Sequence, residues 1–218
     1  MPLKAQRPIL YLITSGATTA ATKTSSKEFQ DILTLVRTAV VANIDLVQLR
    51  EKNLTARTLY ELTARAAEIS GDSGTRLLVN ERSDVAQAAG ADGVHLTTNS
   101  IEASVIRRAF GRDFLIGVST HSLAEARAAR EAGADFAVFG PVFGTESKRQ
   151  YGSPVGLERL HETAQVLASF PVLAIGGISL TNASGCLRAG ASGIAAIRLF
   201  ANSESLGSVV AAIHSVSQ

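Results

Sequence analysis

The sequence predicts an α/β fold of the (β/α)8 barrel type, formed by a single domain that spans residues 1–218. Three observations lead to this prediction: a phrase that occurs four times, a set of apolar runs that brings the expected strands to eight, and strand centres without polar alternation. We expect residues 1–7 to form an N-terminal extension before the first strand. A chain of 218 residues is long enough to bury one sizeable core.

The recurring phrase marks the places where a helix ends and a strand begins. Each copy has a small residue, often Gly, then Ala, Asp or Ser, and then a short apolar run. Glycine at this point ends a helix in the left-handed conformation, and the polar residue after it turns the chain into the next strand. The four copies occupy residues 42–47, 89–94, 132–137 and 189–194.

Four further apolar runs alternate with those copies, namely Ile9–Thr14, Arg76–Asn80, Phe114–Ser119 and Pro171–Gly176. Centres such as residues 77–79 are apolar without interruption, which is typical of parallel strands covered on both faces. Strands that alternate with helices pair in parallel, and eight such units close into a barrel. An open doubly wound sheet is the alternative, but no G-x-G-x-x-G phrase follows the first run.

Helix starts carry their own signals. A Ser followed three residues later by Glu is typical of a capping box, and the sequence has such pairs at Ser25 with Glu28 and at Ser122 with Glu125. The segment 123–132 is rich in alanine and charged residues, as expected of an outer helix that packs on one face.

Composition and charge argue against several classes of function. The net charge is only +2, so electrostatics do not favour a nucleic-acid or membrane-surface partner. No tryptophan is present to build a stacking platform for single-stranded nucleic acid. The single cysteine, Cys186, excludes an intrachain disulfide and a multi-cysteine metal cluster. With no secretory signal segment and no long apolar stretch, we expect a cytoplasmic protein without membrane contact.

Polar and cationic residues gather at the expected carboxyl ends of the strands. Because (β/α)8 enzymes place their active sites at these ends, we expect the site there. The segments concerned are 48–52, 80–82, 95–98, 119–121, 140–149, 176–177 and 197–198.

Two features of this rim predict phosphate binding. Gly176 and Gly177 follow the seventh strand, where barrels often bind phosphate through main-chain N–H groups, although a tight turn is the alternative. Four cations would suit a substrate with two phosphate-bearing parts, although solvated surface charges are the alternative. These four are Arg50, Lys52, Lys148 and Arg198.

Two histidines at strand ends, His95 and His121, are candidate acid–base groups, with a structural role as the alternative. Cys186 lies inside a helical pattern, and we interpret it as a packing residue.

Seven phrases at or near the strand ends follow one another in the chain, at residues 47–52, 78–80, 90–96, 117–121, 139–143, 145–148 and 174–178. Taken in this order, they resemble the thiamine phosphate synthase/TenI family over roughly residues 9–200. The resemblance independently implies a (β/α)8 barrel. It also implies a Mg2+-dependent transferase that joins hydroxymethylpyrimidine diphosphate to thiazole phosphate and releases diphosphate. In that family diphosphate leaves first and the thiazole nitrogen attacks the pyrimidine cation.

The resemblance assigns roles to individual residues. Contacts to the diphosphate and pyrimidine fall to Gln48, Arg50, Lys52, Asn80, Ser119 and Lys148, of which Lys148, Ser119 and Arg50 are the predicted catalytic residues. The thiazole phosphate site falls to Thr145, Ser147, Gly176 and Gly177, and we place Ile197 and Arg198 at the same substrate site because they end the eighth strand.

Several positions depart from the family pattern. Glu81 stands where synthases carry Asp, and Ser100 stands where they carry a second Asp, so we predict a weakened Mg2+ site with Glu81 as its protein ligand. Arg198 stands where the family has Ser. Pro141 stands where TenI-type thiazole tautomerases carry His, and proline transfers no proton.

Three functions remain open at this point. The leading hypothesis is a thiamine phosphate synthase-like enzyme that acts on small phosphorylated molecules. The alternatives are a TenI-like thiazole tautomerase and a non-catalytic paralogue that binds or senses a phosphate ligand. The sequence leaves homo-oligomerisation open.

Overall fold

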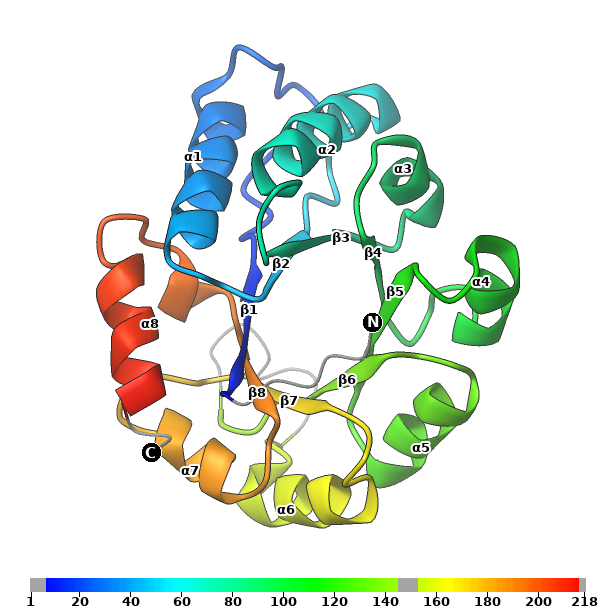
Figure 1. The fold of residues 1–218 in the computed structure, drawn as a ribbon, viewed down its shortest axis with the longest axis vertical. Helices are drawn as coiled ribbons and strands as arrows, with labels where there is room; N and C mark the ends of the chain where they lie inside the picture. Colours follow the sequence, from blue (N-terminus) through cyan, green and yellow to red (C-terminus); the bar gives the residue numbers. More distant parts are fainter. Residues whose placement is uncertain (1–6, 145–152, 216–218) are drawn as a thin grey trace.

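A computed structural model describes residues 7–144 and 153–215, and its strands close into one parallel barrel in chain order (Figure 1). Closure comes from β8 pairing with β1, with Leu10 opposite Ile194. The fold confirms the predicted (β/α)8 barrel. The strands are β1 (Ile9–Ile13), β2 (Leu46–Leu49), β3 (Arg76–Asn80), β4 (Gly93–Leu96), β5 (Leu115–Thr120), β6 (Phe136–Phe139), β7 (Val172–Ile175) and β8 (Gly193–Ala196).

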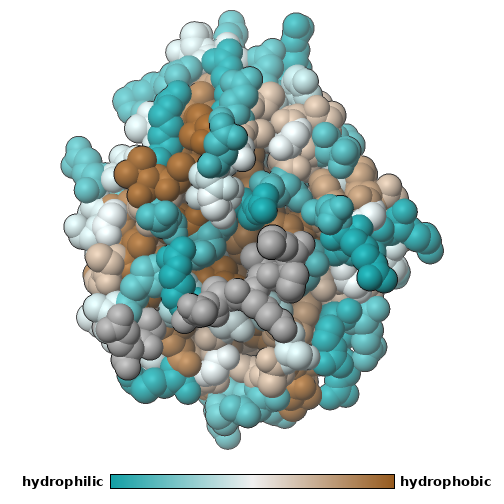
Figure 2. All heavy atoms as spheres, in the orientation of Figure 1, coloured by the Kyte–Doolittle hydropathy of each residue, from teal (hydrophilic) through white to brown (hydrophobic). Residues whose placement is uncertain are grey.

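Helices form a ring outside the strands (Figure 1). Hydrophilic side chains dominate the periphery in the same orientation (Figure 2), as expected of helices that pack on one face only. The helices are α1 (Lys27–Val41), α2 (Ala56–Ser70), α3 (Ser83–Ala88), α4 (Ala103–Phe110), α5 (Leu123–Glu131), α6 (Gly156–Val166), α7 (Ala183–Arg188) and α8 (Leu206–Ser215), with a short 3-10 helix, η2 (Arg198–Phe200), after β8. Within the described ranges, none of them is long and apolar enough to cross a membrane.

One of the two predicted capping boxes is confirmed at its N-cap. The Ser122 hydroxyl accepts a hydrogen bond from the Glu125 N–H at 3.2 Å and caps α5. The box predicted at Ser25 with Glu28 is wrong, because α1 begins one residue later with Ser26 at the N-cap position. Both positions are serines, so the sequence alone did not distinguish them.

The recurring phrase has a structural cause. Its polar residue accepts a hydrogen bond from a main-chain N–H at the start of the preceding strand, a group that would otherwise lack a partner in the barrel. The four pairs are Asp45 with Leu10 at 2.8 Å, Asp92 with Leu77 at 2.8 Å, Asp135 with Ile116 at 2.7 Å and Ser192 with Val172 at 3.3 Å. In the three copies that contain Asp, an arginine also forms an ion pair with the carboxylate. The pairs are Arg7 with Asp45, Arg76 with Asp92 and Arg107 with Asp135. The repeat therefore ties strands together in pairs.

The core consists of two layers on either side of the strands. The larger layer lies between the strands and the helices. The smaller layer fills the barrel interior and includes Tyr11, Leu78, Phe136 and Leu173. Because side chains alternate along a strand, the continuous apolar runs supply both layers. The interior layer supports the polar side chains at the carboxyl ends of the strands.

Candidate active site

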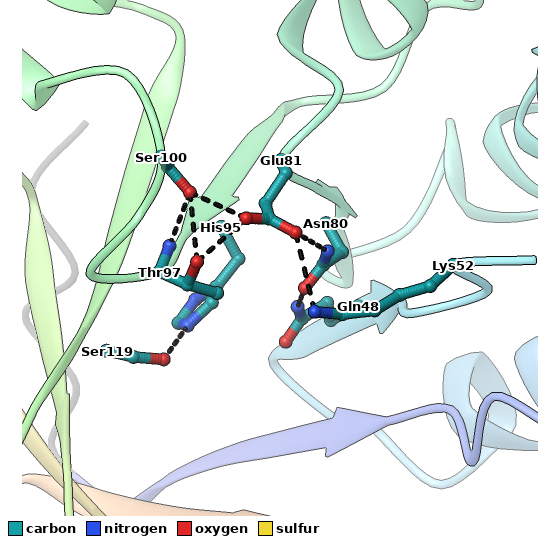
Figure 3. A network of polar contacts seen from close by, with 8 residues as sticks. All are labelled: Gln48, Lys52, Asn80, Glu81, His95, Thr97, Ser100 and Ser119. Atoms are coloured by element: carbon teal, nitrogen blue, oxygen red, sulfur yellow. Dashed lines mark hydrogen bonds and ion pairs between the residues drawn. The ribbon is translucent and has the colours of Figure 1, made fainter.

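A chain of side-chain hydrogen bonds runs across the carboxyl ends of β2 and β3 (Figure 3). The Tyr11 hydroxyl donates to Gln48 Oε1 at 3.2 Å, and Gln48 Nε2 donates to Asn80 Oδ1 at 3.0 Å. Asn80 Nδ2 then donates to Glu81 Oε2 at 2.9 Å. Gln48 and Asn80 are both buried, and parallel pairing brings these two strand ends to one edge. The structure therefore brings together two predicted substrate-binding amides and the predicted metal ligand.

Glu81 ends this chain and accepts further bonds on its other oxygen. Thr97 and Ser100 donate hydroxyl hydrogen bonds to Oε1 at 2.7 and 3.0 Å, and the Lys52 ammonium lies 3.5 Å from Oε2. Burial acts to raise the pKa of Glu81, but the bonds from Thr97 and Ser100, the charge of Lys52 and the bond from Asn80 together hold that pKa below its ordinary value. Glu81 is therefore an ionised acceptor at neutral pH.

The contacts around Glu81 do not fit a preformed Mg2+ site. A carboxylate offers about four acceptor positions, and hydrogen bonds from Asn80, Thr97 and Ser100 already occupy three of those of Glu81, with the Lys52 ammonium 3.5 Å from Oε2. Ser100 supplies a hydroxyl that donates to Glu81 rather than a second carboxylate that would bind the ion. In the part of the chain that the structure describes, no group of three metal-ligating side chains is present. Glu81 as a metal ligand stays a prediction, and its surroundings favour a different role.

His95 and Ser119 form a second polar contact, inside the barrel between β4 and β5 (Figure 3). His95 Nε2 lies 2.9 Å from Ser119 Oγ, and the ring packs near Tyr11 and Phe136. Burial lowers the pKa of His95 to about 3, with the charge of Glu81 opposing this shift. His95 is thus a neutral ring that contacts a predicted catalytic hydroxyl, which favours the structural alternative over acid–base catalysis.

Gly117 makes the space that His95 occupies. A Cβ atom at this position would lie 2.4 Å from Phe136 Cζ and 2.7 Å from His95 Nδ1. Any larger residue would displace the ring, so the Gly-Val-Ser phrase at this strand end serves to place His95 beside Ser119.

Arg50 is held through its main chain by the loop that follows β1. Its N–H donates to Thr14 Oγ1 at 2.8 Å, and Thr14 in turn donates to Glu51 Oε1 at 2.6 Å. Glu51 is buried and also accepts from the Thr18 hydroxyl at 2.6 Å and from the Gly16 N–H at 3.1 Å. Glu51 had no role in the sequence-based hypothesis. An acid between two cations at a strand end was the signal that could have singled it out.

A pocket of about 200 Å3 opens beside the chain of hydrogen bonds. Lys52, Asn80, Glu81 and Arg82 line it together with apolar side chains that include Leu49. Its lining brings two cations, Lys52 and Arg82, together with two carboxylates, Glu51 and Glu81, beside the Asn80 amide.

The two glycines after β7 adopt the left-handed conformation, with φ of 98° for Gly176 and 65° for Gly177. A Cβ atom on Gly176 would lie 2.5 Å from Pro141, and one on Gly177 would lie 2.8 Å from the carbonyl oxygen of Gly144. The loop after β6 thus packs directly on the glycines, and Phe143 N–H donates to Gly176 O at 3.0 Å. The predicted residues Thr145, Ser147 and Lys148 lie outside the described residues.

The remaining predicted residues lie at separate places. Ile197 packs against the interior layer, while Arg198 begins η2 with an exposed side chain. His121 is exposed and lies 3.1 Å from Glu125 at the start of α5, where it has a local partner. Cys186 is fully buried in α7, and burial raises the pKa of its thiol to about 11, in agreement with a packing role.

Comparisons with known proteins agree with this geometry. The model of the thiamine monophosphate synthase family matches residues 10–200. The chain belongs to this family. A thiamine-phosphate synthase of Roseiflexus sp. is 39% identical over 182 residues, which cover 84% of this chain and 77% of the relative. A thiamine-phosphate synthase of Haloarcula marismortui is 36% identical over 209 residues, which cover 94% and 95%.

Solved structures give the same result. A thiamine phosphate pyrophosphorylase from Pyrococcus furiosus superposes with a TM-score of 0.79 at 29% sequence identity, over 96% of this chain and 95% of that one. The resemblance noted from the strand-end phrases is therefore confirmed at the level of family and fold.

Proposed function

We propose that this member of the thiamine monophosphate synthase family joins hydroxymethylpyrimidine diphosphate to thiazole phosphate, forming thiamine phosphate and diphosphate. The observation that carries the proposal is the chain Gln48–Asn80–Glu81 beside Lys52, at the strand ends where barrel enzymes place their sites. Family membership supplies the reaction class. Gln48 and Asn80 supply amides that can bind a heterocycle, and Lys52 supplies a cation that can bind an anionic group.

The reaction breaks one bond and forms one. The C–O bond between the pyrimidine methylene carbon and the diphosphate breaks, and its electron pair leaves with the diphosphate. The lone pair of the thiazole nitrogen then forms the new C–N bond. Negative charge grows on the leaving diphosphate, so cations fixed near it lower the barrier. We assign this role to Arg50, Lys52 and Lys148, with Ser119 as a hydroxyl donor.

The second substrate requires a phosphate subsite. We assign it to the glycine turn at Gly176 and Gly177 together with Thr145, Ser147, Ile197 and Arg198. The left-handed backbone and close packing of the two glycines exclude side chains there, which leaves main-chain amides to approach an anion. Arg198 adds an exposed guanidinium at the end of β8.

We derive no step through a protein-bound metal ion, because the contacts of Glu81 do not fit one. Any Mg2+ that takes part would be held mainly by the diphosphate itself. We propose a cytoplasmic enzyme whose partners are small phosphorylated molecules.

A second candidate is the non-catalytic paralogue that binds a phosphate ligand. The observation in its favour is that Glu81 accepts hydrogen bonds from Asn80, Thr97 and Ser100, with Ser100 in place of an acid. The TenI-like alternative gains nothing from the site, because Pro141 offers no proton-transfer group at the end of β6.

Turnover of purified protein separates these functions. Incubation with both substrates, followed by mass spectrometry, should yield thiamine phosphate. Binding of thiazole phosphate without any product would instead favour the binding paralogue. Isomerisation of a thiazole phosphate in the absence of the pyrimidine substrate would favour the tautomerase.

A further inference from the structure

In the chain of hydrogen bonds from Tyr11 to Glu81, every bond is donated toward Glu81. An ionised carboxylate accepts and never donates, so Asn80 must present its amide nitrogen to Glu81. The Asn80 oxygen then faces Gln48, which must present its own nitrogen, and the Gln48 oxygen is left to accept from the Tyr11 hydroxyl. The orientation of both amides therefore follows from the oxygen acceptor at the end of the chain, which the Lys52 ammonium 3.5 Å from Oε2 also favours on that side.

Glu81 is itself held from several sides. Thr97 and Ser100 donate to Oε1, while Asn80 donates to Oε2. Its main-chain N–H donates to the carbonyl of His95 at 2.9 Å, and its φ of 59° places it in the left-handed region. These contacts leave the carboxylate little freedom to turn toward a metal ion.

We infer that Glu81 is a positioning residue that acts through Asn80 and Gln48, and that it thereby selects a substrate ring with adjacent donor and acceptor groups. Beyond these bonds each amide has one further N–H and one further oxygen lone pair, and Asn80 lines the pocket beside Lys52. An aminopyrimidine edge, with an amino donor beside a ring-nitrogen acceptor, is complementary to such groups in one orientation only. The inference rests on the proposed function for the identity of the ring.

The identity of Ser100 fits this role. A second carboxylate at residue 100 would lie against Glu81 and repel it, whereas a hydroxyl donates to it at 3.0 Å. Ser100, which stands where the family carries a second Asp, is thus explained by its hydrogen bond to Glu81, and this explanation requires no metal ion.

Two substitutions separate an anchor from a metal ligand. Glu81→Gln keeps an oxygen to accept from Asn80 and offers its amide N–H to the hydroxyls of Thr97 and Ser100, which accept as readily as they donate. It preserves the direction of the chain but removes the negative charge that a metal ligand needs. Glu81→Ala removes the acceptor, so the Asn80 and Gln48 amides lose the group that fixes them.

The experiment measures steady-state kinetics with hydroxymethylpyrimidine diphosphate varied at saturating thiazole phosphate, over a series of Mg2+ concentrations. We expect Glu81→Ala to raise KM for the pyrimidine substrate by on the order of tenfold or more, the usual effect of one misplaced hydrogen-bonding group. Glu81→Gln should leave KM within about threefold of the parent and leave the Mg2+ concentration for half-activity unchanged. Ser100→Ala removes one bond to Glu81 Oε1 but leaves the bond from Asn80 to Oε2, so we expect it to raise KM less than Glu81→Ala does.

Side-chain NMR gives a readout that does not depend on turnover. The Asn80 and Gln48 amide protons should exchange slowly in the parent and in Glu81→Gln, and rapidly in Glu81→Ala. Circular dichroism confirms that each variant is folded.

Each outcome decides a separate question. If Glu81→Gln is as damaging as Glu81→Ala and needs more Mg2+, Glu81 is a metal ligand and the inference is wrong. If Glu81→Ala changes neither KM nor amide exchange, the inference is wrong as well. If the parent forms no product, the proposed function fails, and the amide exchange alone then supports or overturns the positioning role.

Discussion

His95 Nε2 lies 2.9 Å from Ser119 Oγ, so a buried ring on β4 contacts a predicted catalytic hydroxyl on β5. The other ring nitrogen, Nδ1, is buried and has no partner among the described residues. A proton on Nδ1 would therefore be a buried donor without an acceptor, which is costlier than an unpaired acceptor. The proton belongs on Nε2, which donates to Ser119 and leaves the hydroxyl hydrogen of Ser119 available for a substrate.

The low pKa of His95 predicts a dependence of stability on pH. The unfolded chain takes up a proton below its ordinary pKa of about 6.5, whereas the folded chain does not until about pH 3. The contribution of His95 is therefore complete above pH 6.5 and is lost as the pH falls, by up to ~1.4 kcal/mol per pH unit. His95→Gln should make the free energy of unfolding less dependent on pH between 6.5 and 4.

Urea denaturation at several pH values measures this effect. An equal slope in the parent and in His95→Gln would show that His95 takes up its proton at the same pH in the folded and the unfolded chain, which contradicts this account.

Substitution of the polar residue in different copies of the recurring phrase should lower the free energy of unfolding by different amounts. Asp135→Ala leaves the Ile116 N–H without its acceptor and Arg107 without its ion pair, so we expect a loss of about 1–3 kcal/mol in the free energy of unfolding. Ser192→Ala breaks a longer bond, of 3.3 Å to Val172, without a charged partner, and should cost less. Chemical denaturation of both variants checks the order, and a larger loss for Ser192→Ala would contradict it.

Replacement of Ser100 by Asp should create a metal site that the parent lacks. The new carboxylate would lie near Glu81 Oε1, which is 3.0 Å from Ser100 Oγ, and paired carboxylates attract Mg2+. Calorimetric titration with Mg2+ should detect binding to Ser100→Asp, and at most weak binding to the parent. Ser100→Asn is the neutral control. Equal Mg2+ binding by the parent and Ser100→Asp would argue against this account of the site.

Lys148 is predicted to stabilise the leaving diphosphate. Loss of one charge-assisted contact to a developing anion raises a barrier by about 2–4 kcal/mol, so Lys148→Ala should lower kcat roughly 30- to 900-fold. Lys27, an exposed residue paired with Asp31 on α1, provides the control substitution Lys27→Ala. Near-normal kcat in Lys148→Ala would remove its assigned role.

Much of the fold could be predicted because its signals are local. The strand Arg76–Asn80 agrees with its expected bounds, and the predicted Phe114–Ser119 is displaced by one residue from the observed Leu115–Thr120. Apolar runs and glycine helix ends depend only on nearby residues. The function of Asp45, Asp92 and Asp135 as partners of a preceding strand was not predicted, because it depends on contacts distant in sequence.

The sequence predicted where in the barrel the site lies, but not which side chains contact one another within it. Topology brings the ends of β2 and β3 together, so Gln48 and Asn80 were expected near each other. The hydrogen bonds from Thr97 and Ser100 to Glu81 depend on side-chain geometry that the sequence does not encode locally. The buried role of Glu51 was missed for the same reason, since its partners come from the loop after β1.

The most direct test of the proposed function is the product balance of purified protein supplied with both substrates and Mg2+. Chromatography with fluorescent detection of oxidised thiamine phosphate, run beside a diphosphate assay, measures both products. We predict equimolar thiamine phosphate and diphosphate, formed only when both substrates are present. Bound thiazole phosphate with neither product formed at any Mg2+ concentration would contradict the proposal.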